Sequence, residues 1–323
     1  MSEIMVSICC ITYNHEKYIT DAIDSFLMQK TDFPYEILIH DDASTDSTPD
    51  IIRSYENKYP NIIKAIYQSE NQYSQKIKIF GKYLFPLARG KYIALCEGDD
   101  YWIDKNKLQL QVNYMQNHPS CSLCFHAAKV VTRNQKSIHA LRPYTHNILC
   151  DTEMVILQPS NYPTASILFP AKFVKNTPDF YNNAPVGDVP LHLFLTHQGY
   201  AYYFDQYLSA YRTGVEISWS SSMRTGDVTE NIQKFRKQII LMYLQFDIYT
   251  EGIYTDEIKI IIEKLHFFIL LDDKRYKSIK NSNYRKYYRE LTLRQHIHYF
   301  LDRFCPGILS GIRKMRAKFG RNN

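Results

Sequence analysis

The sequence predicts an α/β protein with a mostly parallel central sheet, flanking helices and a C-terminal helical extension. Two observations support this prediction. Short apolar runs rich in branched residues alternate with helix-like segments over the first hundred residues, and such strands pair in parallel through right-handed crossovers. The pattern then becomes helical from about residue 227 onward. The apolar runs predict strands at 5–11, 35–40, 62–68 and 91–96.

Helices are expected in the intervals between these strands. Apolar residues recur three or four positions apart over 19–27 and again over 51–55, which is the spacing of one helix face. A third helix is expected over 76–89, ended by Gly90. These helices would cover the faces of the sheet.

Apolar spacing also predicts the later elements. Strands are expected at 122–131 and 164–169, and a helix at 187–199. The segment 235–246 is apolar nearly all round, which predicts a helix packed on both sides, and 258–271 predicts a buried amphipathic helix.

The changes of pattern divide the chain into three parts. Residues 1–115 and 116–226 are expected to form the two halves of one α/β domain, and 227–323 a helical region. The formal net charge of +6 is mild for 323 residues, so we expect no nucleic-acid partner. No window approaches 18 uncharged apolar residues, so no membrane-spanning helix is expected.

The cysteines favour a reducing compartment. Cys121 and Cys124 form the only CxxC pair among seven scattered cysteines, and no second pair lies at zinc spacing. This pattern argues against a structural metal site. Because the N-terminus carries no signal peptide, a cytoplasmic location is expected.

Polar clusters follow three of the predicted strands where each strand ends. They are Thr12-Tyr13-Asn14, Asp41-Asp42 and Asp99-Asp100. Because ligands collect at the carboxyl ends of strands in open parallel sheets, we expect these clusters to form one site.

The residue types in these clusters suit a nucleoside diphosphate bound with a metal. Asp99 and Asp100, within YIALCEGDDYW (92–102), offer oxygen ligands to Mg²⁺ or Mn²⁺, whose shell is completed by phosphate oxygens and water. The second acidic pair offers hydrogen-bond acceptors to a nucleoside, and Tyr13 offers an aromatic face to its base. An isolated pair of aspartates is usually a solvated turn, but two such pairs at one sheet edge favour binding.

Three blocks of the sequence resemble the successive motifs of family 2 glycosyltransferases. They are VSICCITYNHEKYITDAIDSFLMQ, EILIHDDASTDST and ARGKYIALCEGDDYW. The resemblance extends from about residue 5 to residue 220. It implies the GT-A fold, which is Rossmann-like, and a metal-dependent, inverting enzyme that uses a nucleotide-sugar donor.

The resemblance also implies roles for particular residues. Tyr13 would pack against the base, Asp42 would bond a uracil-type base edge, and Asp188 would be the catalytic base. An alternative for Asp188 is a helix N-cap, a role that aspartate fills well. The implied nucleotide-binding residues are Thr12, Tyr13, Asp42 and Asp99, and the implied metal ligands are Asp99 and Asp100.

The sequence departs from the family pattern near the diphosphate. Relatives often carry an arginine and an asparagine in the helix before the fourth strand, where this chain has Gly81 and Lys82. Lys76, Lys78 or Lys82 could replace the arginine, and the sequence does not choose among them.

A second departure concerns the metal. Many relatives have a histidine after a Tyr-Arg pair late in the catalytic domain, but here Tyr211 and Arg212 are followed by Thr213. A third protein ligand is therefore in doubt, although Arg212 could still approach the phosphates.

The expected function is transfer of a sugar from a UDP-sugar to a hydroxyl of a glycan or lipid-linked acceptor, in the biosynthesis of a cell-surface polysaccharide. The main alternative is a non-catalytic partner subunit that binds a nucleotide sugar or a glycan. A sugar nucleotidyltransferase is disfavoured because CITYNHEKY lacks the glycines of a phosphate loop, and a processive synthase because it needs spanning helices.

The end of the chain, FCPGILSGIRKMRAKFGRNN, contains five Lys or Arg residues and no acidic residue. Its apolar and basic residues separate on a helical wheel, as in helices that lie on anionic bilayers. A solvated tail helix packed on its own protein is an equal alternative. The tail is thus compatible with peripheral contact at the inner face of the cell membrane.

Overall fold

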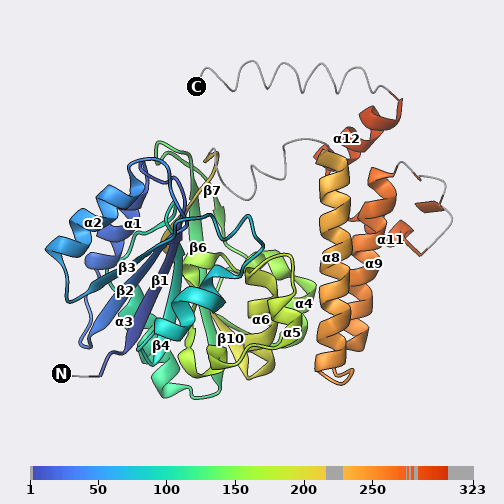
Figure 1. Cartoon of the computed structure of the whole chain (residues 1–323). Coiled ribbons are helices and arrows are strands. Elements are labelled where there is room, and N and C mark those ends of the chain that lie inside the picture. Colours follow the sequence, from blue (N-terminus) through green and yellow to red (C-terminus); the bar gives the residue numbers. More distant parts are fainter. Residues whose placement is uncertain (1–2, 216–227, 274, 276–277, 280–282, 305–323) are drawn as a thin grey trace.

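The computed structural model describes residues 3–215, 228–273, 275, 278–279 and 283–304 (Figure 1). The strands are β1 (Val6–Thr12), β2 (Tyr35–Asp41), β3 (Ile63–Tyr67), β4 (Tyr92–Glu97), β5 (Tyr101–Trp102), β6 (Cys121–Val131), β7 (Ser137–Leu141), β8 (Ile148–Cys150), β9 (Leu168–Pro170) and β10 (Tyr200–Arg212). The α-helices are α1 (Ile19–Leu27), α2 (Thr48–Lys58), α3 (Lys107–Asn117), α4 (Thr152–Leu157), α5 (Asp179–Asn182), α6 (Asp188–His197), α8 (Val228–Tyr249), α9 (Thr255–Asp272), α11 (Arg285–Arg289) and α12 (Leu293–Phe304).

The ten strands form one sheet whose main order is β3-β2-β1-β4-β9-β6-β10-β5. The first four strands of the chain pair in parallel, which confirms the prediction from the alternating pattern. In β1, Thr12 lies opposite Asp41 of β2, and Ile11 lies opposite Glu97 of β4. The carboxyl ends of these strands therefore meet at one edge.

Helices cover both faces of the sheet (Figure 1). Alternate residues of β1 point to opposite faces: Val6, Ile8 and Cys10 pack with α1, α2 and α3, whereas Cys9 belongs to the core shared with α4, α6, α8 and α9. The α8–α9 pair thus forms an outer layer next to the α/β body.

The two expected halves of the α/β domain share this sheet. β9 pairs with both β4 and β6, and β5 leaves β4 to pair antiparallel with β10 at the far edge of the main order. The sheet is therefore built by strands from both sides of residue 115.

Two sequence predictions about helices are wrong. The helix expected over 76–89 is a single π turn, Phe80–Leu84, and a 3₁₀ turn, Phe85–Leu87, because Lys76 has a left-handed backbone (φ 63°) and Pro86 has no amide proton. The helix expected to pack on both sides, within α8, is buried on one side only, since Leu241 and Leu244 face solvent.

The strand expected at 164–169 is likewise shorter than predicted. A 3₁₀ turn, Thr164–Ser166, precedes the strand, which is confined to Leu168–Pro170.

Gly90 has a role that the sequence did not reveal: a Cβ there would lie 2.5 Å from the backbone nitrogen of Ser7, so only glycine lets this loop approach β1.

In the part of the chain that the structure describes, no helix is both long and apolar enough to cross a membrane. The basic amphipathic tail predicted at the end of the chain falls within 305–323, outside the described residues.

Candidate active site

Backbone hydrogen bonds hold together the loops that follow β1, β2 and β4. The amide of Asp42 donates to the carbonyl oxygen of Thr12 (2.9 Å), and the amide of Gly98 donates to that of Ile11 (2.8 Å). The predicted polar clusters thus lie side by side at the carboxyl edge of the sheet, as expected from parallel pairing.

Gly98 allows the β4 loop to lie directly on the β1 loop. A Cβ at this position would lie 2.7 Å from Oγ1 of Thr12 and 3.1 Å from Nδ1 of His15. Both of these polar atoms are buried without a hydrogen-bond partner. The Thr12 side chain therefore lies under the acidic loop.

The acidic loop buries several carboxyl groups close together. Asp99 and Asp100 are both buried, and Oδ1 of Asp100 accepts a hydrogen bond from the backbone amide of Arg212 (2.7 Å). Burial, together with the charges of Asp99 and Glu97, raises the pKa of Asp100 well above its usual range. Burial and the charges of Asp99 and Asp188 raise the pKa of Glu97 to about 8. Glu97 and Asp100 therefore retain protons near neutral pH unless a cation balances their charges.

Arg212 supports the acidic loop through contacts within the protein. Its Nε donates to the carbonyl oxygen of Asp99 (2.8 Å), its Nη1 to that of Arg133 (3.0 Å) and its Nη2 to Oδ2 of Asp21 (2.7 Å). The side chain is buried between two tyrosine rings. The guanidinium is thus engaged by protein acceptors, which argues against the approach to the phosphates that was considered for Arg212.

Asp188 is the first residue of α6 and is exposed to solvent. Its charge acts on Glu97, Lys78 and Tyr211, so the fold brings it to the acidic loop although more than eighty residues separate them in the sequence. Its Oδ1 also accepts from the next backbone amide, that of Val189 (2.8 Å), which is part of the capping role considered above.

Two residues near Asp188 were not assigned from the sequence. Lys78 donates from Nζ to the carbonyl oxygen of Val186 (2.6 Å), and burial lowers its pKa to about 8 despite the charge of Asp188. His192 is buried one helical turn after Asp188 with neither ring nitrogen bonded, and burial lowers its pKa to about 4. The four-residue spacing on α6 could have indicated His192. Lys78 was one of three candidate lysines, and nothing in the sequence distinguished it from Lys76 and Lys82.

Asp42 fixes the chain that follows β3. Its Oδ1 accepts from the backbone amide of Gln72 (2.7 Å), and its Oδ2 accepts from that of Tyr73 (3.0 Å). Tyr13, at the end of β1, is partly exposed at the same edge. Asp42 thus shapes a turn beside the predicted nucleotide site.

The donor atoms at this edge suit a hard divalent cation only in part. Among the residues that the structure describes, no three His, Cys, Asp or Glu side chains are grouped as metal ligands. Asp99 and Asp100 supply carboxylate oxygens, and Mg²⁺ or Mn²⁺ held by one or two carboxylates takes its other ligands from phosphate and water. The residues present therefore fit a cation that binds together with a phosphorylated ligand.

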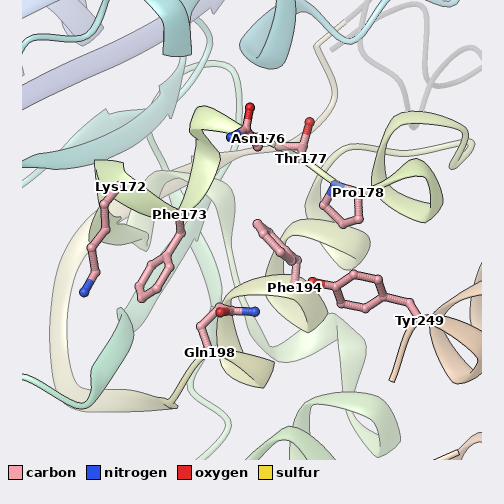
Figure 2. A pocket seen from close by; sticks show the side chains of 8 residues that line it. All are labelled: Lys172, Phe173, Asn176, Thr177, Pro178, Phe194, Gln198 and Tyr249. Atoms are coloured by element: carbon pink, nitrogen blue, oxygen red, sulfur yellow. The ribbon is translucent and has the colours of Figure 1, made fainter. Parts of the chain in front are cut away.

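A pocket of about 470 Å³ lies elsewhere in the structure (Figure 2). Its lining includes Phe173, Phe194, Gln198 and Tyr249. Asp188 begins α6, whereas Phe194 lies six residues and the C-cap Gln198 ten residues further on, which is about 9 and about 15 Å of helix length away. The pocket is therefore separate from the acidic edge.

A parallel α/β sheet with acidic side chains at the carboxyl ends of its strands is an architecture of nucleotide-sugar-dependent glycosyltransferases. A family model described as "Glycosyl transferase family 2" matches residues 7–168, about half of the chain. The chain therefore belongs to glycosyl transferase family 2, as the resemblance of its motifs indicated.

Relatives that match part of the chain include two bacterial proteins. An uncharacterized protein of Mycobacterium tuberculosis is 45% identical over 128 residues, which are 39% of this chain and 36% of that protein. The putative teichuronic acid biosynthesis glycosyltransferase TuaG of Bacillus subtilis is 32% identical over 147 residues, 44% of this chain and 56% of TuaG. The matches thus span about half or less of these relatives.

One solved structure with a similar fold is that of Staphylococcus aureus TarS, residues 1–349, in complex with UDP-GlcNAc. It superposes with a TM-score of 0.59 at 17% sequence identity, covering 92% of this chain and 78% of that one. This likeness confirms the GT-A fold and the helices that follow it.

Proposed function

We propose that this protein transfers a sugar from a UDP-sugar to a hydroxyl of a glycan or lipid-linked acceptor, with inversion at the anomeric carbon, in the synthesis of a cell-surface polysaccharide. The observation that carries the proposal is the position of Asp188 beside the buried acidic loop. A general base and a donor site then share one edge of the sheet. The solved TarS complex contains UDP-GlcNAc, and TuaG is named for teichuronic acid biosynthesis, which supports the choice of donor and product class.

Four residues would bind the nucleotide. Tyr13 would contact the base, and Thr12 and Asp99 lie at the same edge. Each carboxylate oxygen of Asp42 accepts one backbone amide and keeps a second lone pair, with which it can accept an N–H of uracil.

Asp99 and Asp100 would hold Mn²⁺ or Mg²⁺ together with the diphosphate. The cost of burying adjacent carboxylates makes this position favourable for a cation, since an opposite charge restores their ionised form. When bound, such an ion stabilises the negative charge that develops on the leaving diphosphate.

Asp188 would act as the general base. Its carboxylate accepts the proton of the acceptor hydroxyl while that oxygen forms a bond to the anomeric carbon. The bond from this carbon to the diphosphate oxygen breaks on the opposite side, so the configuration inverts. Exposure of Asp188 at the start of α6 leaves it accessible to an acceptor from solvent.

Lys78 is the lysine best placed to neutralise the diphosphate. It is partly buried and under the influence of Asp188, whereas Lys76 and Lys82 are exposed. A cation held near the acidic edge would attract the phosphates more strongly than one in bulk solvent.

Replacing Lys78 with methionine is expected to weaken UDP binding about 10- to 100-fold, the range for loss of a hydrogen bond to a charged group. Lys78→Arg should retain most of the affinity. Because the pKa of Lys78 is about 8 in the free protein, wild-type affinity should decline as the pH rises through 8, and Lys78→Arg should remove this decline. Calorimetric titration with UDP and Mn²⁺ between pH 6.5 and 9.5 measures both effects.

Lys76→Met and Lys82→Met are matched controls that remove an exposed charge from the same segment. Both should bind UDP as the wild type does. A large loss with Lys82→Met, or none with Lys78→Met, would reassign the phosphate contact.

The proposed activity is tested by a panel of UDP-, GDP- and dTDP-sugars with Mn²⁺ or Mg²⁺. A UDP-sugar is expected to raise the melting temperature of the protein in the presence of metal. Addition of a glycan or lipid-linked acceptor to the protein and this donor should then lead to release of UDP. Stabilisation without UDP release across the acceptors would favour the alternative, a subunit that binds a nucleotide sugar without transferring it. If none of the donors raises the melting temperature of the protein, the proposed function is wrong. We place the reaction in the cytoplasm, at the inner face of the membrane when the acceptor carries a lipid.

A further inference from the structure

The helix α12 presents an apolar stripe to solvent. Leu293, Ile297, Phe300 and Phe304 retain 76%, 51%, 58% and 58% of their accessible surface. At 100° per residue these four side chains fall within an arc of about 60°. We call them the α12 stripe.

The α12 stripe is on a part of the helix that does not face the protein. Tyr299, which lies elsewhere on the helix circumference, packs against the small core formed by Phe267, Leu271 and Tyr287. A surface helix normally turns its apolar face toward the core. Here the helix is attached through another side, and its most apolar arc faces outward, as in a docking surface.

The charge of the chain around α12 indicates what docks there. From residue 293 to the end, the sequence contains seven Lys or Arg residues and a single acidic residue, Asp302. Apolar residues also continue after Phe304 at intervals of three or four positions: Ile308, Ile312, Met315 and Phe319. Apolar residues at helical spacing combined with excess positive charge are the two signals of helices that lie on anionic membranes.

The position of α12 permits such contact. It lies near one end of the α8–α9 hairpin, to the side of the α/β body (Figure 1). A flat surface could therefore meet α12 without displacing the helices that cover the sheet.

We propose that the α12 stripe inserts into the headgroup region of an anionic lipid bilayer, to which the net positive charge of the sequence from residue 293 onward attracts the protein. This contact would hold the protein at the surface where a lipid-linked acceptor resides. That consequence rests on the proposed function, but the lipid contact is measured without donor or acceptor.

The test is cosedimentation of the full chain with vesicles of 30% phosphatidylglycerol and 70% phosphatidylcholine, and with vesicles of phosphatidylcholine alone. Wild type is expected to bind the anionic vesicles and to be released by 0.5 M NaCl. The variant Leu293→Ser, Ile297→Ser, Phe300→Ser, Phe304→Ser should lose at least about tenfold in partitioning, because both lipid signals are needed for stable binding.

The α8–α9 hairpin offers a matched control. Leu241, Leu244, Ile248 and Ile253 retain 56%, 46%, 78% and 65% of their surface, close to the values of the α12 stripe. Their replacement by serine should leave vesicle binding unchanged. Each variant is folded if its melting temperature equals that of the wild type. If the protein binds UDP, the increase in melting temperature with UDP should also be unchanged.

Three results would overturn the proposal. They are absence of wild-type binding to anionic vesicles, equal binding by the α12 variant, and equal loss in the control variant. If light scattering instead reveals an oligomer that only the α12 variant dissociates, the stripe is an interface between copies of the chain. If vesicle binding is absent but UDP is released, the lipid contact is wrong and the proposed function is still supported. If vesicles are bound but no UDP is released, the proposed function is wrong and the lipid contact is still supported.

Discussion

Replacing Asp188 with asparagine is expected to reduce the rate of sugar transfer by about 10²- to 10⁴-fold, the usual contribution of a positioned general base. The amide cannot accept the hydroxyl proton, yet it keeps the size of the side chain and can still accept the hydrogen bond from Val189. UDP affinity should therefore stay nearly constant. Initial rates of UDP release with saturating donor, compared with calorimetric UDP binding, separate these two effects.

The matched control is Asp179→Asn. Asp179 is also an exposed aspartate at the first position of a helix, α5, but unlike Asp188 it is not among the charges that raise the pKa of Glu97. Its replacement should leave transfer unchanged. Near-normal transfer by the Asp188 variant would show that another group takes the proton.

Replacing Asp100 with asparagine is expected to abolish most metal-dependent nucleotide binding. Loss of residues that merely orient metal ligands costs about 10- to 100-fold in metal affinity, so loss of a ligand should cost at least about 100-fold. The asparagine Oδ1 can still accept from the amide of Arg212, so the loop should keep its conformation. Calorimetric titration of UDP with Mn²⁺ measures the loss.

Chelation provides the internal control for the Asp100 variant. In EDTA, wild type and variant should bind UDP equally weakly, because the difference between them requires the ion. Without metal, the variant should be at least as stable as the wild type, since burial raises the pKa of Asp100 and folding must therefore oppose the ionisation that this carboxyl group has in the unfolded chain. Equal UDP affinity of the two proteins in Mn²⁺ would exclude Asp100 as a ligand.

The parts of the fold that were predictable depend on local pattern. Apolar runs bounded by polar residues gave the first four strands nearly to the residue, and parallel pairing then placed Thr12, Asp41 and Glu97 at one edge. Chemistry could be inferred there because consecutive aspartates at the end of a buried strand are costly without a ligand. Asp188 required family resemblance, because as a local signal it is an ordinary helix start.

The remainder depends on contacts distant in sequence. Arg212 and Asp21 are 191 positions apart, and no periodicity in the sequence indicates that they form an ion pair. A regular helix was expected over 76–89, where the structure has only the turns Phe80–Leu84 and Phe85–Leu87. Just before this segment, the carboxylate of Asp42 holds the amides of Gln72 and Tyr73 in a turn. Lys78, within the same segment, bonds the carbonyl oxygen of Val186 just before α6, which spacing alone could not indicate.

The partnership between Asp100 and Arg212 has a consequence during synthesis of the protein. A ribosome-bound chain that ends before residue 212 contains β1 to β4 but lacks the amide that fixes Oδ1 of Asp100 and the guanidinium that bonds Asp99. β5 also lacks its neighbour β10. The nascent polypeptide therefore cannot complete the contacts of the acidic loop until translation has passed Arg212.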